Sequence, residues 1–402
     1  MASAPAPLSA ADPIVILSYA RTPMGSFQGC LSGASATQLG AAAVRGAVDR
    51  AGVAAAAVER IYMGCVLSAG LGQAPARQAA IGAGLGAHVE ATTVNKMCGS
   101  GMQAAIMGAE ALAAGSVDLL VAGGMESMTN APYLMTKHRG GARIGHDRIL
   151  DHMMLDGLED AYDPGRAMGT FAEDIAREYQ FTREAMDDYA IASLTRAQQA
   201  QASGAFDREI VPVEVAGRKG STTVTLDEQP ARGDVAKIPT LKAAFAKDGA
   251  ITAANSSSIS DGAAALVMTR QSVADRLGLT PIARIVALGA HAHEPARFST
   301  APVDAIRKTL NKAGWSADSV DLFEVNEAFA VVAMIAMRDL GLSHDRVNVH
   351  GGACALGHPI GASGARVLAT LLSALETTGG RRGVASLCIG GGEATAMAVE
   401  RL

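Results

Sequence analysis

The sequence predicts an α/β protein in which buried strands alternate with helices. Apolar, strand-like runs occur at 13–18, 61–67, 117–122 and 384–389, and Ala-rich helical stretches lie between them. The runs at 117–122 and 384–389 are apolar throughout and end in glycines, which is typical of strands that are covered on both faces. A repeat within the chain, described below, supports the same layered arrangement.

Five stretches have the composition and length expected of helices. They are residues 38–51, 101–114, 184–202, 303–313 and 361–375. Their alternation with the apolar runs indicates helices packed on buried sheets.

The two ends of the chain repeat one another. A helix ending at Ala51 leads to VERIYMG from Val58, and a helix ending at Ala313 leads to VDLFEVN from Val320; positions 51 and 313, like 58 and 320, are 262 apart. Later in each half a Gly-rich loop opens a helix, and a strand then runs into two glycines. The shared order predicts two similar α/β halves, and the reuse of common strings by unrelated α/β proteins is the alternative.

The segment between the halves differs in character. It contains most of the charged clusters and several methionines, and the apolar run after Asp261 returns the chain to the core. We therefore expect a disordered tail at 1–12, an N-terminal half at 13–129 plus 250–280, an inserted loop domain at 130–249 and a C-terminal half at 281–402. Insertions of this kind commonly carry specificity and oligomer contacts.

The composition excludes several classes of protein. Of the 402 residues, 49% are hydrophobic and 18% are charged, which excludes an intrinsically disordered chain. No apolar run reaches the roughly 18–20 uncharged residues of a membrane helix. A net charge of −5 argues against nucleic acid as a partner. The tail before residue 13 contains no Lys or Arg and so lacks the basic region of a signal peptide, and we expect a cytoplasmic protein.

The cysteines follow no disulfide or zinc pattern. Their number is odd and no CxxC pair occurs, so we expect reduced thiols and no metal site. The cysteines are Cys30, Cys65, Cys98, Cys354 and Cys388.

Two of these thiols stand at the ends of strand-like runs. Cys98 lies between a β-rich run and an Ala-rich helix, where backbone N–H groups and the helix dipole favour a thiolate. Cys388 follows an apolar run and precedes Gly390, and glycines after a strand leave N–H groups free to hold an oxyanion. Both thiols are candidates for chemistry, and a small buried cysteine is the alternative for each.

His358 and Asn326 are the remaining polar candidates. Pro359 disfavours helix at His358, so the imidazole is presented from an extended segment before a helix begins. Asn326 closes the repeat at a strand end, where its amide can orient a water or donate to an oxyanion. A structural turn histidine and an ordinary helix N-cap are the alternatives. Among the other histidines, only His350, on the same loop as His358, has a comparable claim.

One loop fits a different and looser pattern. GSGMQA from Gly99 matches the G-x-G-x-x-A of dinucleotide-binding loops, with Glu126 about 25 residues further on. A phosphate-binding loop does not need a cysteine immediately before its first glycine, and the C-terminal half supplies no matching acid and base. We therefore do not expect a nicotinamide cofactor.

Five strings occur together in a fixed order. They are NKMCGSG from Asn95, GGMESM from Gly123, NEAFA from Asn326, GGACALGHPIGASG from Gly351 and CIGGG from Cys388. As an ordered set they resemble the thiolases, in particular the acetyl-CoA acetyltransferases, over residues 13–402. The resemblance implies the thiolase fold, with two related βαβαβαββ halves in a five-layer αβαβα core and an inserted loop domain.

The resemblance also implies a role for each candidate. Cys98 would take the acyl group as a thioester, His358 would accept the Cys98 proton, and Cys388 would remove an α-proton from a second acetyl-CoA. Asn326 would hold a water that forms one oxyanion hole with His358, and the backbone N–H groups of Cys98 and Gly390 would form the other. The implied reaction is the reversible ping-pong Claisen condensation of two acetyl-CoA to acetoacetyl-CoA and CoA, with no metal or cofactor.

The same resemblance identifies a pocket for the pantetheine and acyl groups. Its expected lining residues are Met168, Phe245, Ala253, Ser257 and Phe329. Three positions depart from the family pattern and leave the chain-length preference open: Ala167 and His350 stand where His and Asn are usual, and Phe171 where Thr is common.

Several expectations concern partners. The basic strings 139–148 and 218–219 are candidates for contacts with CoA phosphates or within a homotetramer built as a dimer of dimers, and a solvated loop is the alternative. A 3-ketoacyl-CoA thiolase of broader specificity would share every catalytic residue. A non-catalytic acyl-CoA-binding relative of the fold would lack Cys98, His358 or Cys388, and all three are present.

Overall fold

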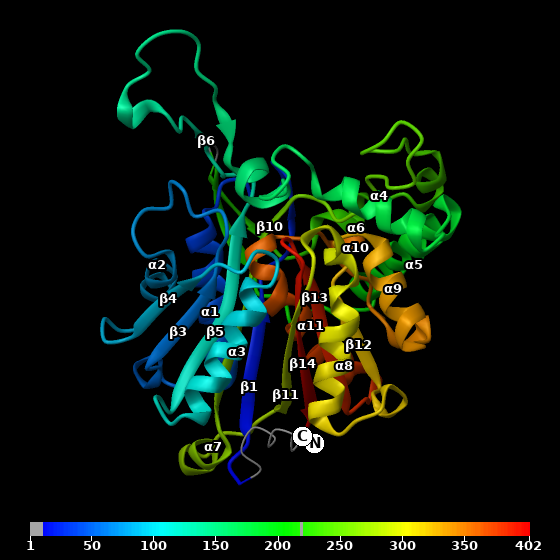
Figure 1. The fold of residues 1–402 in the computed structure, drawn as a ribbon. Coiled ribbons are helices and arrows are strands. Elements are labelled where there is room, and N and C mark those ends of the chain that lie inside the picture. Colours follow the sequence, from blue (N-terminus) through cyan, green and yellow to red (C-terminus); the bar gives the residue numbers. More distant parts are fainter. Residues whose placement is uncertain (1–10, 218–219) are drawn as a thin grey trace.

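A computed structural model describes residues 11–217 and 220–402, and it contains a large mixed sheet flanked by helices (Figure 1). The α/β class predicted from the sequence is confirmed. The strands lie in the order β12-β13-β14-β11-β1-β10-β5-β3-β4, and β2 pairs with β10. In chain order their bounds are β1 Ile14–Arg21, β2 Gly25–Ser26, β3 Arg60–Gly64, β4 Glu90–Val94, β5 Leu119–Ser127, β10 Ser260–Arg270, β11 Ala283–Ala292, β12 Leu322–Val325, β13 Arg382–Ile389 and β14 Glu393–Arg401.

The two halves of this sheet have matching topology. In the N-terminal half β1, β10 and β5 pair antiparallel, and β3 and β4 continue the sheet in parallel. In the C-terminal half β11, β14 and β13 pair antiparallel, and β12 continues in parallel. The halves join where β1 pairs with β11. This correspondence supports the duplication inferred from the 262-residue repeat.

Helices cover both faces of each half. The principal ones are α1 Ala36–Ala51, α2 Pro75–Gly82, α3 Ser100–Ala113, α7 Gln271–Leu277, α8 Ala301–Ala313, α9 Ala330–Leu340, α10 Ala353–Leu356 and α11 Ile360–Thr378. α3 and α11 pack against each other and against the inner faces of β5, β10 and β13, whereas α1 and α8 cover outer faces. Sequence patterning found α1, α3, α8 and α11 to within a few residues, but it did not find α2 or α9.

Strand β1 shows how the layers divide the core. Its alternate residues Ile14 and Ile16 belong to the central apolar cluster with α3 and α11, while Val15 and Leu17 belong to the outer cluster with α1. All four are at most 4% exposed. Because successive side chains of a strand point to opposite faces, a strand buried on both faces is apolar throughout. The continuous apolar runs in the sequence have this cause.

A long segment leaves the sheet after β5 and returns with β10, and the insertion expected at 130–249 falls within it. Its helices and strands are β6 Tyr133–Leu134, β7 Leu150–Asp151, a π-helical turn Met154–Leu158, α4 Met168–Glu178, α5 Arg183–Ala202, β8 Val213–Gly217, β9 Gly220–Val224 and α6 Glu228–Arg232. β6 and β7 form the stem of a protruding exposed loop (Figure 1). The fully buried Arg21 of β1 ties the segment to the core, since it pairs with Glu209 at 2.9 Å and Asp227 at 2.7 Å.

Short 3₁₀ turns complete the described secondary structure. They span Ala55–Ala57, His138–Gly140, Val235–Thr240, Pro295–Thr300, Ala317–Ser319 and His344–Arg346. Of the predicted tail, residues 1–10 lie outside the described residues, and Asp12 accepts hydrogen bonds from the backbone N–H and the hydroxyl of Ser272 at 2.9 and 2.7 Å.

Candidate active site

The two central helices begin next to each other, and the loops that precede them border one cavity. An added Cβ at Gly101 of α3 would lie 2.7 Å from the backbone nitrogen of Ala365, and one at Gly364 of α11 would lie 2.2 Å from that of Met102. Only glycine permits backbones to approach this closely. The Gly-rich strings seen in the sequence therefore bring the Cys98 loop and the His358 loop together.

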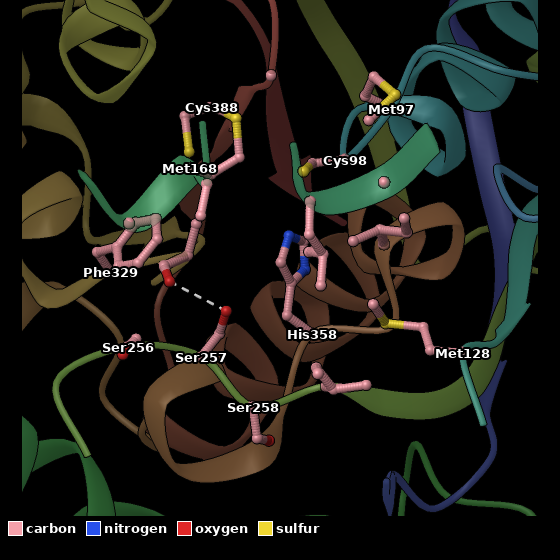
Figure 2. A pocket seen from close by; sticks show the side chains of 18 of the residues that line it. Met97, Cys98, Met128, Met168, Ser256, Ser257, Ser258, Phe329, His358 and Cys388 are labelled. Atoms are coloured by element: carbon pink, nitrogen blue, oxygen red, sulfur yellow. Dashed lines mark hydrogen bonds between the residues drawn. The ribbon is translucent and has the colours of Figure 1, made fainter. Parts of the chain in front are cut away.

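The cavity has a volume of about 410 Å³ and is lined by both halves and by the inserted segment. Figure 2 shows the Cys98, Cys388, Met168 and His358 side chains around one shared space. The fold thus brings the two thiols and the imidazole to one site, although Cys98 and His358 are 260 residues apart in the sequence.

Cys98 lies immediately before the N-cap of α3. Gly99 is the N-cap residue, and Met97 adopts a left-handed backbone with φ of 48°. The backbone N–H groups of Gly390 and of Cys98 itself act on the thiol and lower its pKa, but burial is the larger effect and raises it to about 11. The loop lies at a helix N-terminus as predicted and its N–H groups lower the thiol pKa as expected, but desolvation of the thiol is the larger effect.

The loop that carries Gly390 comes from the opposite half. Gly391 and Gly392 both have positive φ, 96° and 89°, so the chain turns sharply after Cys388 and β13. Lys96 of the Cys98 loop forms an ion pair with Glu393 at the start of β14. This pair joins the two loops, which explains how a backbone N–H from one half reaches the thiol of the other.

His358 is held from one side by α11, the helix that begins two residues after it. Its Nδ1 lies 2.5 Å from the Ser363 hydroxyl oxygen, and that hydroxyl donates to the Pro359 carbonyl at 2.9 Å. Because the single hydroxyl proton is used on Pro359, Nδ1 carries the ring proton and donates it to Ser363. Nε2 is then unprotonated, and it is buried with no partner among the described residues. Burial, together with Arg366, lowers the imidazole pKa to about 3, so the ring is neutral.

Cys388 is the next-to-last residue of β13 and lines the same cavity. The residue is 1% exposed. Burial raises its pKa well above the ordinary value, and the proximity of Cys98 raises it further. At neutral pH both thiols are therefore protonated beside a neutral imidazole.

Asn326 lies behind His358 and does not line the cavity. It is fully buried directly after β12, and its Nδ2 is 3.5 Å from His358 Nδ1. Its side-chain oxygen accepts a hydrogen bond from Arg366 at 3.1 Å. The side chain of Asn326 is not an N-cap for α9, because Phe329 occupies that position.

All five residues expected to bind substrate lie on the cavity wall, namely Met168, Phe245, Ala253, Ser257 and Phe329. Sequence reasoning missed further wall residues: Met97, Met128, Met154, Leu158, Ile259, Phe298 and Ile360. Three of these stand inside the quoted strings, Met97 in NKMCGSG, Met128 in GGMESM and Ile360 in GHPIG. Their place within the motifs was therefore a signal that was available.

The three departures from the family pattern differ in position. Ala167 lines the cavity. Phe171 is buried beneath Arg166, whose guanidinium lies 3.7 Å from the ring centre, and it does not reach the cavity wall. His350 packs edge-on against Phe206 with ring centres 6.0 Å apart and is likewise absent from the wall, so its claim to the site is not supported. Of these three residues, only Ala167 can alter the shape of the pocket directly.

A second cavity of about 230 Å³ adjoins the first and shares Ala253 with it. Its wall includes two cationic residues, Arg232 and Lys237. The basic string 139–148 does not line either cavity and forms the exposed loop after β6, and residues 218–219 lie outside the described residues.

Glu126 was the acid that the dinucleotide alternative required. It is fully buried and accepts backbone N–H groups from Val66 at 3.0 Å, Leu67 at 3.1 Å and Gly361 at 2.9 Å. Burial raises its pKa to about 7. A buried carboxylate that already accepts three backbone hydrogen bonds is not available to a ribose. Glu126 instead joins the end of β5 to the start of α11.

Among the residues that the structure describes, no group of three or more His, Cys, Asp or Glu side chains is placed to hold a metal ion. None of the described helices is both long enough and apolar enough to cross a membrane.

Comparison with known sequences decides the family. The thiolase N-terminal domain matches residues 14–272, and the thiolase C-terminal domain matches residues 279–401. The chain is a thiolase. The five-layer fold implied by the sequence strings is thereby confirmed, together with membership of an acyltransferase family.

Similar proteins cover nearly the whole length of this thiolase. It is 50% identical over 395 residues to an acetyl-CoA acetyltransferase of Saccharomyces pastorianus, covering 97% of this chain and 99% of that protein. It is 47% identical over 393 residues to the cytosolic acetyl-CoA acetyltransferase of Mus musculus, covering 97% and 98%. The crystal structure of Acat5 thiolase from Ascaris suum in complex with coenzyme A matches with a TM-score of 0.91 and 42% identity, covering 97% of this chain and all of that one.

Proposed function

We propose that this thiolase is an acetyl-CoA C-acetyltransferase that condenses two acetyl-CoA to acetoacetyl-CoA and CoA, reversibly, through acetyl-Cys98. One observation carries the proposal. Two thiols from opposite halves and a neutral imidazole face one cavity, and two backbone N–H groups lie at the Cys98 sulfur. Relatives named as acetyl-CoA acetyltransferases support the choice of substrate.

Acetyl transfer is the first half-reaction. The Cys98 sulfur attacks the thioester carbonyl carbon as its proton passes to Nε2 of His358, and the N–H groups of Cys98 and Gly390 stabilise the oxyanion. The C–S bond to CoA then breaks, and the leaving sulfur takes the Cys388 proton. The products are acetyl-Cys98, free CoA, an imidazolium and a Cys388 thiolate. Since Cys98 is protonated at rest, proton transfer and attack must be coupled.

Carbon–carbon bond formation is the second half-reaction. The Cys388 thiolate removes an α-proton from a second acetyl-CoA, and the imidazolium of His358, with a water held by Asn326, stabilises the enolate oxygen. The enolate carbon attacks the acetyl group, the bond to Cys98 breaks, and the Cys98 sulfur takes the proton from His358. Burial of Cys388 assists this step, because a thiol with a raised pKa gives a more basic thiolate.

The wall chemistry supports a CoA thioester as the ligand. Met168, Phe245 and Phe329 supply apolar surface for the pantetheine arm, and Ser257 donates its hydroxyl to the Ala328 carbonyl at 3.0 Å (Figure 2). Arg232 and Lys237 of the adjoining cavity, which form ion pairs with Glu228 and Asp234, are the candidates for contacts with the CoA phosphates. The sequence did not predict these two cations, because neither stands in a basic string.

Thiolysis of 3-ketoacyl-CoA substrates of increasing chain length is the experiment that tests the proposal. Acetoacetyl-CoA should be cleaved with the highest kcat/KM, and mass spectrometry should find an acetyl group on Cys98. Equal or higher efficiency with six- to ten-carbon substrates would instead identify a 3-ketoacyl-CoA thiolase of broad specificity. CoA-ester binding without any cleavage would identify a non-catalytic acyl-CoA-binding protein.

Three properties complete the proposal. We propose a cytoplasmic location, supported by relatives named as cytosolic, and subcellular fractionation tests it. A homotetramer is supported by the edge position of β4 and by the exposed loop after β6, since an unpaired strand edge is a natural pairing surface; light scattering after gel filtration tests it. Thiol and imidazole groups suffice for each step above, so activity should survive EDTA treatment without a metal or cofactor.

A further inference from the structure

A buried ion pair lies behind the imidazole. Arg366 of α11 is fully buried, and its guanidinium donates to Glu324 of β12 at 2.9 Å. Glu324 is 2% exposed, and burial raises its pKa to about 8 although Arg366 opposes this. The Nε of Arg366 has no partner among the described residues. A pair of this kind is costly to bury and is weak evidence for stability, so its presence needs another explanation.

The same guanidinium determines which way the Asn326 amide faces. Arg366 donates to the side-chain oxygen of Asn326 at 3.1 Å. A guanidinium has donors and no acceptor, so it can bind the amide oxygen and cannot bind the amide nitrogen. The oxygen is therefore held toward Arg366, and the NH₂ group faces His358, with Nδ2 3.5 Å from Nδ1.

The secondary structure makes this arrangement rigid. Glu324 and Asn326 are two residues apart at the end of β12 and so lie on one face of the strand. Ser363 and Arg366 are three residues apart on α11 and so lie on one face of the helix. One helix face thus holds the His358 ring through Ser363 and the Asn326 amide through Arg366.

We propose that the Glu324–Arg366 pair is a positioning device for carbon–carbon bond formation: it holds the Asn326 amide with its N–H groups toward His358, where the amide binds the water that stabilises the enolate oxygen. The inference rests on the proposed function. Without Arg366 the amide is free to rotate and present its oxygen, an acceptor, where a donor is needed. Acetyl transfer to Cys98 uses the N–H groups of Cys98 and Gly390 and does not need Asn326.

Substitution of Arg366→Lys tests the inference through the separate half-reactions. A lysine reaches one acceptor where arginine reaches two, so Asn326 is released while the positive charge beside Glu324 is kept. We expect exchange of the α-protons of acetyl-CoA with deuterated water to slow by about tenfold or more. Formation of acetyl-Cys98, followed by mass spectrometry, should stay within about threefold of the unsubstituted protein.

Arg21→Lys is the matched control. Arg21 is also fully buried and also binds two acceptor residues, Glu209 and Asp227, and none of the three lines the cavity. The control should leave the ratio of the two half-reactions unchanged. If Arg366→Lys lowers both half-reactions by the same factor, or leaves both unchanged, the positioning role is wrong.

Two additional variants keep the test decisive. In the Asn326→Ala background, Arg366→Lys should have no further effect on proton exchange, because a residue acting through Asn326 gives a non-additive pair; additive losses would overturn the inference. Glu324→Gln preserves shape, and if Arg366→Lys does not fold, it should give a smaller loss confined to the same half-reaction. Absence of both half-reactions in the unsubstituted protein would refute the proposed function itself.

Discussion

In the N-terminal half the loop before α3 presents a thiol, Cys98, whereas in the C-terminal half the equivalent loop before α11 presents an imidazole, His358. The two helices occupy matching places in matching sheets and pack against each other. Duplication thus supplied two helix N-termini at one point, and divergence gave them different side chains. The matching folds of the two halves place the two loops together, and the different side chains on these loops provide the nucleophile and the base.

The strand ends differ in the same way. At the 262-residue offset Asn326 corresponds to Gly64, where an added Cβ would lie 2.6 Å from the carbonyl oxygen of Gly361. The N-terminal half therefore has a glycine at this strand end, where a side chain would block the approach of α11. The C-terminal half instead provides the amide of Asn326, the imidazole of His358 and the thiol of Cys388. Cys98 carries the acetyl group through both half-reactions, whereas Asn326 acts only in the second, so variants at these sites should affect the half-reactions differently.

Cys98→Ser should have the largest effect. The hydroxyl is a far weaker nucleophile than the thiol, and we expect kcat for condensation to fall by about 10⁴-fold or more. Mass spectrometry after incubation with acetyl-CoA should find no acetyl group at residue 98. A stable acetyl group on any other residue of an active protein would remove Cys98 from its proposed role.

Cys388→Ala should separate the half-reactions. Acetyl-Cys98 should still form, because the attacking sulfur, His358 and the N–H groups of Cys98 and Gly390 are untouched, and without the Cys388 proton the CoA sulfur can leave as a thiolate that takes a proton from water. Exchange of α-protons into deuterated water should fall by about 10²–10⁴-fold, the usual contribution of a positioned base. Exchange at an undiminished rate would show that another group is the base.

Gly364→Ala should weaken the contact between the halves themselves. Its Cβ would lie 2.2 Å from the backbone nitrogen of Met102, so α3 and α11 must move apart. We expect the free energy of unfolding to fall by about 1–3 kcal/mol, the typical cost of overpacking. Gly140→Ala is the control, since nothing lies within 4 Å of its Cβ and its φ is not positive. Equal stability of the two variants in urea unfolding would contradict the account of the helix crossing.

The sequence predicted the reacting groups better than their surroundings. Cys98, His358, Cys388 and Gly390 stand in short local strings at strand and helix ends, and all four line the cavity. The partnership of Glu324 with Arg366 spans 42 residues and depends on how α11 lies on β12, which no local pattern encodes.

The sequence did not predict the wall residues from the insertion or the desolvation of Cys98, for a related reason. Met154 and Leu158 reach the cavity from a π-helical turn whose packing is tertiary. The helix end beside Cys98 is visible in the sequence, but the burial that raises the thiol pKa is contributed by distant segments. The effect of a helix end on a thiol pKa can be deduced from the local sequence, whereas the effect of burial depends on the complete fold.

Alkylation of the thiols across a pH series measures whether the helix end or burial has the larger effect on the pKa of Cys98. Iodoacetamide reacts with thiolate, and with a pKa of about 11 only about 10⁻⁴ of Cys98 is ionised at pH 7. The rate should rise about tenfold per pH unit from pH 7 to 10, because each unit of pH multiplies the thiolate fraction tenfold below the pKa. A rate that levels off below pH 8 would show that the helix end outweighs burial after all.

Cys30 provides the comparison within the same molecule. Like Cys98 it is partly exposed, and burial of its thiol together with the neighbouring Glu228 raises its pKa to about 12. Cys98 should therefore label before Cys30 at every pH, and acetyl-CoA should protect Cys98 while leaving Cys30 unprotected, as peptide mapping will measure. Protection of both cysteines would mean that ligand binding closes the whole molecule, whereas selective protection places the acetyl group at the junction of the two halves.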